Sequence, residues 1–168
     1  MKFFILVLTA MVIAISTTAA EYVVRKGDTF SGIAKTACIS QAELRRLNPA
    51  VDVDRLRVGQ RLTIPALDYK RLFSAFVYVE SRGDDNAVGD NGKAVGCIQM
   101  WPIMVNEVNR LIGKDIFTYN DRLNRERSYY MFIIIMNRNK VRTVDDAVRI
   151  WNPKYKGSKY RDAYRNRL

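Results

Sequence analysis

The residue best suited to chemistry in this chain is Glu80, a carboxylate predicted to end an apolar helical face. The residues of this face follow the spacing i, i+3, i+4, i+7 and i+11: Tyr69, Leu72, Phe73, Phe76 and Glu80. Because aromatic neighbours desolvate a carboxylate and disfavour its charged form, we expect a raised pKa for Glu80. A carboxyl group that keeps its proton near neutral pH can protonate the leaving oxygen of a glycosidic bond.

The composition makes carboxylates the main acid–base groups of the chain. Its 168 residues include no histidine, which excludes Ser/His and Cys/His nucleophiles and His-zinc sites. The two cysteines, Cys38 and Cys97, are too few and too far apart for a four-cysteine metal site or a disulfide-dense scaffold. We therefore expect no metal site and no cofactor.

Three aspartates follow Glu80 closely and could take part in the same reaction. They are Asp84, Asp85 and Asp90. One of them could position a water molecule and make the site a hydrolase. Aspartate is also common in turns, so the sequence leaves open which of the three assists, if any.

The first 20 residues have the layout of a secretory signal peptide. Lys2 precedes an almost unbroken apolar run from Phe3 to Ile15, and small residues follow up to Ala20. The run is shorter than the roughly 20 residues that span a bilayer. We therefore expect cleavage after Ala20, a secreted or periplasmic location, and no stable membrane span afterwards.

The charge balance indicates which partners such a protein would meet. The chain has 28 Lys and Arg against 17 Asp and Glu, a net charge of +11. In an exported protein this favours the polyanions of a cell wall over nucleic acid. The expected partners are peptidoglycan glycan strands, with anionic wall polymers as a further candidate.

The segment after residue 20 predicts a small module of two strands and two helices. Ser40 and Glu43 form a capping box, in which Ser40 accepts the Glu43 amide and Glu43 reaches back to the Ser40 amide. The economical packing pairs the strands antiparallel and lays both helices on one face. The strands are expected at 22–24 and 61–65, and the helices at 29–35 and 40–48.

Three stretches of this module resemble a LysM domain from end to end. They are YVVRKGDTFSGIA at 22–34, LRRLNP at 44–49 and LRVGQRLTIP at 56–65. The resemblance places a LysM domain at residues 21–66. It implies binding to the N-acetylglucosamine units of peptidoglycan or chitin.

Residues 67–168 follow a short connector and predict a helical domain. After the Glu80 helix, a helix begins at Pro102 and stops at Gly113, and another runs from Asn120 or Asp121 to about Asn137. The apolar stretch 129–136 of the latter predicts a buried central helix. A further helix is expected from Thr143 to about Trp151. The fold class is therefore α+β, a small βααβ module followed by a mainly α-helical domain.

The Glu80 region is similar to the lytic transglycosylase and goose-type lysozyme superfamily. The matching segments are ESRG at 80–83, a glycine-rich loop at 89–96, and CIQMWP at 97–102. The similarity covers 73–102 well and continues weakly to 152. It implies that the domain is lysozyme-like and that Glu80 is the catalytic acid. It further implies that the substrate is bound by Ser81, Gln99, Met100, Trp151 and Asn152.

Four positions depart from the family pattern. Cys97 and Ile98 replace the usual Leu-Met, and Pro153 stands where Ala-Gly is usual. Trp151 stands where tyrosine is common, so a hydroxyl that could reach Glu80 is absent at that position.

Together these features predict an exported lytic transglycosylase that acts on the bond between N-acetylmuramic acid and N-acetylglucosamine (MurNAc–GlcNAc). In that family mechanism the glutamate protonates the leaving oxygen and then takes a proton from the sugar's own 6-hydroxyl. A muramidase that hydrolyses the same bond is one alternative. A non-catalytic glycan-binding protein on a lysozyme-like scaffold is another. Cys38 and Cys97 lie in different predicted domains, and we expect two separate thiols.

Overall fold

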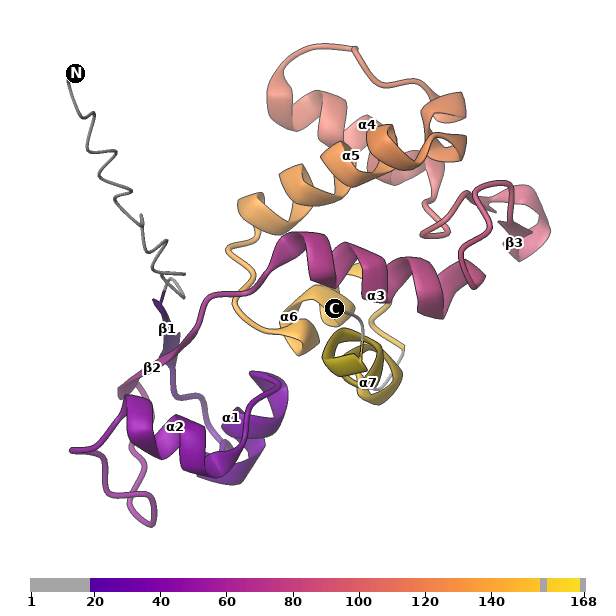
Figure 1. Cartoon of the computed structure of the whole chain (residues 1–168). Helices are drawn as coiled ribbons and strands as arrows, with labels where there is room; N and C mark the ends of the chain where they lie inside the picture. Colours follow the sequence, from indigo (N-terminus) through magenta and orange to yellow (C-terminus); the bar gives the residue numbers. More distant parts are fainter. Residues whose placement is uncertain (1–18, 155–156, 167–168) are drawn as a thin grey trace, which may run out of the picture.

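The computed structural model describes residues 19–154 and 157–166, which form a βααβ module followed by a mainly helical region (Figure 1). Each part has its own cluster of buried apolar residues. None of the helices in these residues is long and apolar enough to cross a membrane.

The N-terminal module has the predicted order of strand, helix, helix and strand. The strands pair antiparallel, with Tyr22 opposite Leu62, and enclose a core that includes Ile33 and Leu44. Its elements are β1 (Ala19–Val23), α1 (Phe30–Thr36), α2 (Gln41–Leu47) and β2 (Arg61–Pro65). Most of the expected signal peptide lies outside the described residues. Its last two residues, Ala19 and Ala20, belong to β1 and lie opposite Pro65 and Ile64.

Side-chain caps begin both helices of this module. Thr29 Oγ1 accepts from the Gly32 amide at 3.0 Å, and Ser40 Oγ accepts from the Glu43 amide at 3.0 Å. The prediction that Glu43 reaches back to the Ser40 amide is wrong. The Glu43 carboxylate instead accepts two hydrogen bonds from Arg46, at 2.9 and 2.7 Å, because the guanidinium one turn later offers a charged, two-pronged donor.

The helical region is built around α3, which carries Glu80. Phe76 of α3 lies at its centre, with ring centroids 5.2 Å from Phe132, 5.9 Å from Trp151 and 4.7 Å from Tyr160. These rings bring three other helices against α3. The elements are α3 (Tyr69–Ser81), β3 (Val88–Gly89), β4 (Ala94–Val95), α4 (Pro102–Ile112), α5 (Arg125–Arg138), α6 (Val144–Trp151) and α7 (Ser158–Asn166). Two 3-10 turns, η1 (Asp90–Gly92) and η2 (Tyr119–Leu123), complete it.

Helix α5 differs from its prediction in two respects. It begins later, because Thr118 and Asp121 form a capping box that opens η2, and Asn124 then caps α5 through the Arg127 amide. It is also not buried on all sides. Tyr130 is 48% exposed, because only the face that includes Phe132 packs on the core.

The two parts of the chain touch directly. Arg25, just after β1, donates from Nη1 to Asp146 Oδ1 of α6 at 2.9 Å. Asp146 also accepts from the Thr143 amide and hydroxyl, so the same carboxylate caps α6. Cys38, between α1 and α2, packs against the core of the helical region. The N-terminal module is therefore docked on α6 and its neighbours.

Both cysteines are free thiols, as expected. Burial raises the pKa of Cys38 and of Cys97 to about 11, so each reacts slowly near neutral pH. We predict that Arg25→Glu speeds labelling of Cys38 several-fold without changing Cys97, because like charges at Asp146 loosen the contact. Labelling followed by peptide mapping measures this.

Arg61→Glu is the matched control, because Arg61 pairs with Glu21 inside the N-terminal module. Unfolding without reductant should release two thiols per chain. A monomer that releases none would contain a disulfide and contradict this assignment.

Candidate active site

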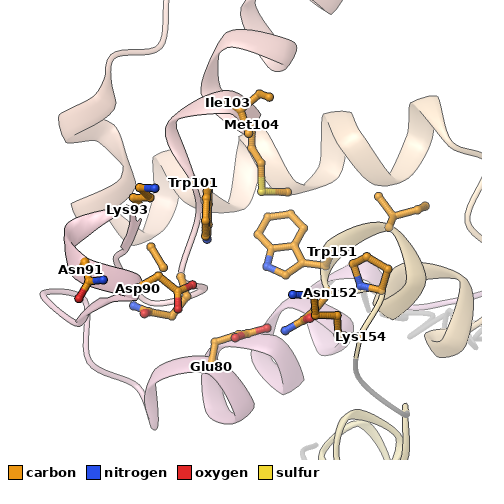
Figure 2. A pocket seen from close by; sticks show the side chains of 14 residues that line it. Glu80, Asp90, Asn91, Lys93, Trp101, Ile103, Met104, Trp151, Asn152 and Lys154 are labelled. Carbon is orange, nitrogen blue, oxygen red and sulfur yellow. The ribbon is translucent and has the colours of Figure 1, made fainter.

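A cavity of about 880 Å³ opens in the helical region, and Glu80 lies on its wall (Figure 2). Four segments that are distant in sequence supply its lining. They are the end of α3 with Glu80, the η1–β4 segment with Asp90, Asn91 and Lys93, the start of α4 with Trp101, Ile103 and Met104, and the end of α6 with Trp151, Asn152 and Lys154.

Glu80 has the environment of a proton donor. Burial raises the pKa of Glu80 above its ordinary value, and the negative charge of Asp90 adds to the rise. A hydrogen bond from Tyr160, whose hydroxyl donates to Glu80 Oε1 at 2.6 Å, acts in the opposite direction. The pKa of Glu80 is therefore raised overall, as the apolar helix face predicts.

Tyr160 is the site residue that sequence reasoning missed. From the sequence, a hydroxyl that could reach Glu80 is considered only at position 151, which is a tryptophan, whereas the structure supplies one from Tyr160 of α7. Tyr160 is 1% exposed, so its ring is fixed by packing. The spacing of Tyr160, Ala163 and Tyr164, at i, i+3 and i+4, is a helical signal that could have predicted α7.

Trp151 and Asn152, both predicted to bind substrate, line the cavity. Trp151 is anchored, because its Nε1 donates to the Ile98 carbonyl at 3.0 Å and its ring packs edge-on to Phe76. Its indole therefore forms a fixed part of the wall.

Gln99 also lines the cavity, in a left-handed backbone conformation with φ of 50°. Its Nε2 donates to the carbonyls of Ala87 and Gly96 at 3.1 and 3.0 Å, which ties two sides of the loop together. A Cβ atom on Gly89 would collide with Gln99 Oε1, so a larger residue there would force the Gln99 side chain to shift.

Two predicted substrate-binding residues lie behind the cavity wall. Ser81 Oγ donates to the Cys97 carbonyl at 2.8 Å and accepts from the Gly83 amide at 3.2 Å, which joins the end of α3 to the loop. Met100 is 0% exposed and belongs to the core. Neither side chain is part of the cavity lining, because each is committed to internal contacts.

Of the three aspartates after Glu80, the structure brings only Asp90 to the cavity. Asp85 pairs with Arg125, with 2.8 Å between Oδ1 and Nε. Asp84 Oδ1 accepts from the Asn86 amide at 2.8 Å, a local hydrogen bond that stabilises the turn.

A buried arginine holds the loop that forms one wall. Arg122 is 8% exposed and donates to the carbonyls of Lys93 and Met100, both at 3.0 Å, and of Tyr119 at 2.7 Å. The backbone of Gly96, with φ of 82°, passes so close to the Arg122 carbonyl that no Cβ atom fits. No local pattern in the sequence marks Arg122, because all these partners are backbone atoms.

The N-terminal module has a second, smaller hollow of about 310 Å³. It lies between the start of α1 and the start of α2, and includes polar side chains and one cation. Its lining is Thr29, Phe30, Ser31, Gln41, Ala42, Arg45, Val53 and Asp54.

Comparison with known proteins identifies this N-terminal module. Residues 22–65 match the family model of the LysM domain, so this part of the chain is a LysM module of the peptidoglycan-binding kind. Over 52 residues in this region the chain is 40% identical to N-acetylmuramoyl-L-alanine amidase XlyB of Bacillus subtilis (strain 168). The aligned segment covers 31% of this chain and 16% of that protein. No solved structure matches the chain significantly.

Arg122→Met should destabilise the protein by about 3 kcal/mol, because it leaves buried carbonyl groups without a donor. Urea unfolding followed by circular dichroism measures the loss. Arg110→Met is the control, since Arg110 forms only an exposed pair with Glu107, and its midpoint should hardly move. Equal midpoints for the two variants would contradict the role of Arg122.

Proposed function

We propose that this chain is an exported lytic transglycosylase that cleaves the MurNAc–GlcNAc bond of peptidoglycan. The observation that carries the proposal is the Glu80 carboxyl group. It lies on the wall of a cavity of about 880 Å³, its pKa is raised by burial, and one of its oxygens is held by Tyr160. This is the environment that glycosidic general acid catalysis needs, and the similarity to the lysozyme-like superfamily points the same way.

In the proposed reaction, Glu80 first donates its proton to the glycosidic oxygen, and the bond from that oxygen to C1 breaks. The Glu80 carboxylate then takes the proton from the 6-hydroxyl of the MurNAc residue whose C1 was released, while its O6 forms the new bond to C1. Glu80 ends protonated, no water is consumed, and the product carries an anhydro end. Tyr160 orients the carboxyl group by donating to Oε1.

The cavity wall suits a sugar chain. Trp101 is 39% exposed and offers an indole face for stacking on a sugar ring, while Gln99 and Asn152 supply polar groups. We propose that the LysM module holds the enzyme on N-acetylglucosamine units of the wall and that the protein acts outside the cytoplasm, in the periplasm or secreted. Tethering raises the local concentration of substrate at the cavity.

A hydrolytic muramidase is the second candidate, and Asp90 is the observation that favours it. Asp90 lines the same cavity as Glu80, and its charge acts on the pKa of Glu80. In an inverting hydrolase it would activate a water molecule on the far side of the sugar. The transglycosylase is preferred because Asp90 is exposed on a turn, and among the residues that the structure describes no side-chain hydrogen bond or ion pair fixes its carboxylate for that task.

We predict that Glu80→Gln lowers clearing of purified cell walls about 100-fold or more, because an amide cannot donate the proton. Turbidity loss measures this. The variant should fold and be the more stable protein above neutral pH. The raised pKa of Glu80 means that the wild type loses stability as pH rises and the buried group ionises.

Glu107→Gln is the matched control, because Glu107 lies on α4 outside the cavity and pairs with Arg110. Full clearing by Glu80→Gln would end the catalytic assignment.

Tyr160→Phe should move the alkaline limb of the pH–activity profile to higher pH. The hydroxyl stabilises the ionised carboxylate, so its loss raises the pKa of Glu80 further and keeps the acid protonated to higher pH. Initial clearing rates over a pH series measure this. A limb that stays in place or moves down would remove Tyr160 from the proposed site.

A fragment of residues 19–66 should sediment with insoluble peptidoglycan. It contains both strands and the complete core of the LysM module, so we expect it to fold alone. Removing it from the full chain should weaken attachment more than it changes the products. A fragment that stays in the supernatant would contradict wall tethering.

A further inference from the structure

Two lysines lie on the wall of the candidate active site. Lys93 and Lys154 line the cavity at its two ends, with Glu80 between them (Figure 2). Within residues 19–154 and 157–166, neither forms an ion pair, although Asp90 lies only three residues before Lys93. The cavity therefore offers free positive charge to whatever enters it.

Lys93 is the better placed of the two, because its backbone is fixed. Its carbonyl accepts from the buried Arg122 guanidinium at 3.0 Å, and its amide donates to the Asp90 carbonyl at 3.2 Å. The turn before it is held in left-handed conformations, with φ of 47° at Asp90 and 53° at Asn91. The ammonium group thus extends from a rigid support.

The Lys93 ammonium group lies beside Trp101, a side chain on which a sugar could stack. Lys93 Nζ lies over one face of the Trp101 ring, 5.7 Å from the ring centre, and Trp101 is partly exposed. A pyranose stacked on the other face of the indole would extend its substituents past the ring edge, within reach of the long lysine side chain. A neutral N-acetyl sugar gains little from such a charge, whereas a carboxylate gains a charge-assisted hydrogen bond.

We propose that Lys93, beside Trp101, makes the cavity selective for glycans that carry carboxylate groups over uncharged N-acetylglucosamine chains. This inference rests on the proposed function for the identity of the cavity. The carboxylate belongs to either the lactyl ether of muramic acid or the peptide attached to it. Lys93 also offsets the repulsion that Asp90 would exert on an anionic substrate.

Tryptophan fluorescence tests this without interference from the LysM module. The chain has two tryptophans, Trp101 and Trp151, and both line the cavity. Titrations use full-length Glu80→Gln, so that no substrate is cleaved. The probes are peptide-free MurNAc–GlcNAc oligosaccharides with free lactyl carboxylates, the same chains bearing stem peptides, and chitin oligosaccharides of equal length.

We expect the carboxylated probes to bind about tenfold more tightly than chitin. Adding Lys93→Gln should remove most of that difference and leave chitin affinity unchanged, while Lys93→Arg should preserve it. Lys114→Gln, at an exposed lysine outside the cavity, removes the same charge and should have no effect. A loss with only one carboxylated probe would identify the lactyl group or the peptide as the ligand.

Equal affinity for all three probes in the parent, or equal losses for all three in Lys93→Gln, would overturn the inference. The proposed function fails separately, when the wild-type enzyme cleaves none of the probes and no purified wall.

Discussion

The structure depends on one constraint, which is that a carboxyl group must be kept partly out of water at the wall of an open cavity. Glu80 is kept partly out of water because α3 buries its apolar face up to the last turn. Tyr160 of α7 also donates a hydrogen bond to one oxygen of the Glu80 carboxyl group. Burial of an acid is unfavourable when it is charged, so the same arrangement that costs stability raises its pKa. The aromatic contacts around Phe76 hold both partners in place.

The helices that complete this site also receive the LysM module. Helix α6 ends at Trp151 on the cavity wall, and Asp146, which completes the capping box at its N-terminus, binds Arg25 of the LysM module. The adjacent Asp145 accepts from Arg161, the neighbour of Tyr160 on α7. Wall attachment and the cavity thus share structural support. The docked arrangement sets the position of the LysM hollow relative to Glu80 more firmly than a free linker would.

Features set by nearby residues could be predicted from the sequence, whereas features set by distant contacts could not. The caps Thr29 and Ser40 and the Glu80 helix depend on neighbours within a turn or two. Tyr160 is 80 positions from the carboxyl group that it binds, and Arg122 acts through backbone carbonyls, which carry no residue signature. The start of α5 was misplaced because Asp121 and Asn124 are both good caps, and packing chose between them.

Mass analysis of peptidoglycan digested by the wild-type chain tests the central claim most directly. If Glu80 acts first as acid and then as base on the sugar's own 6-hydroxyl, the released fragments carry anhydro ends and are one water lighter than hydrolysis products. The Glu80→Gln protein should release neither kind. Fragments with reducing ends alone would show that water is the nucleophile and favour the hydrolase in which Asp90 acts. A wild-type digest without released fragments would contradict the enzymatic account altogether.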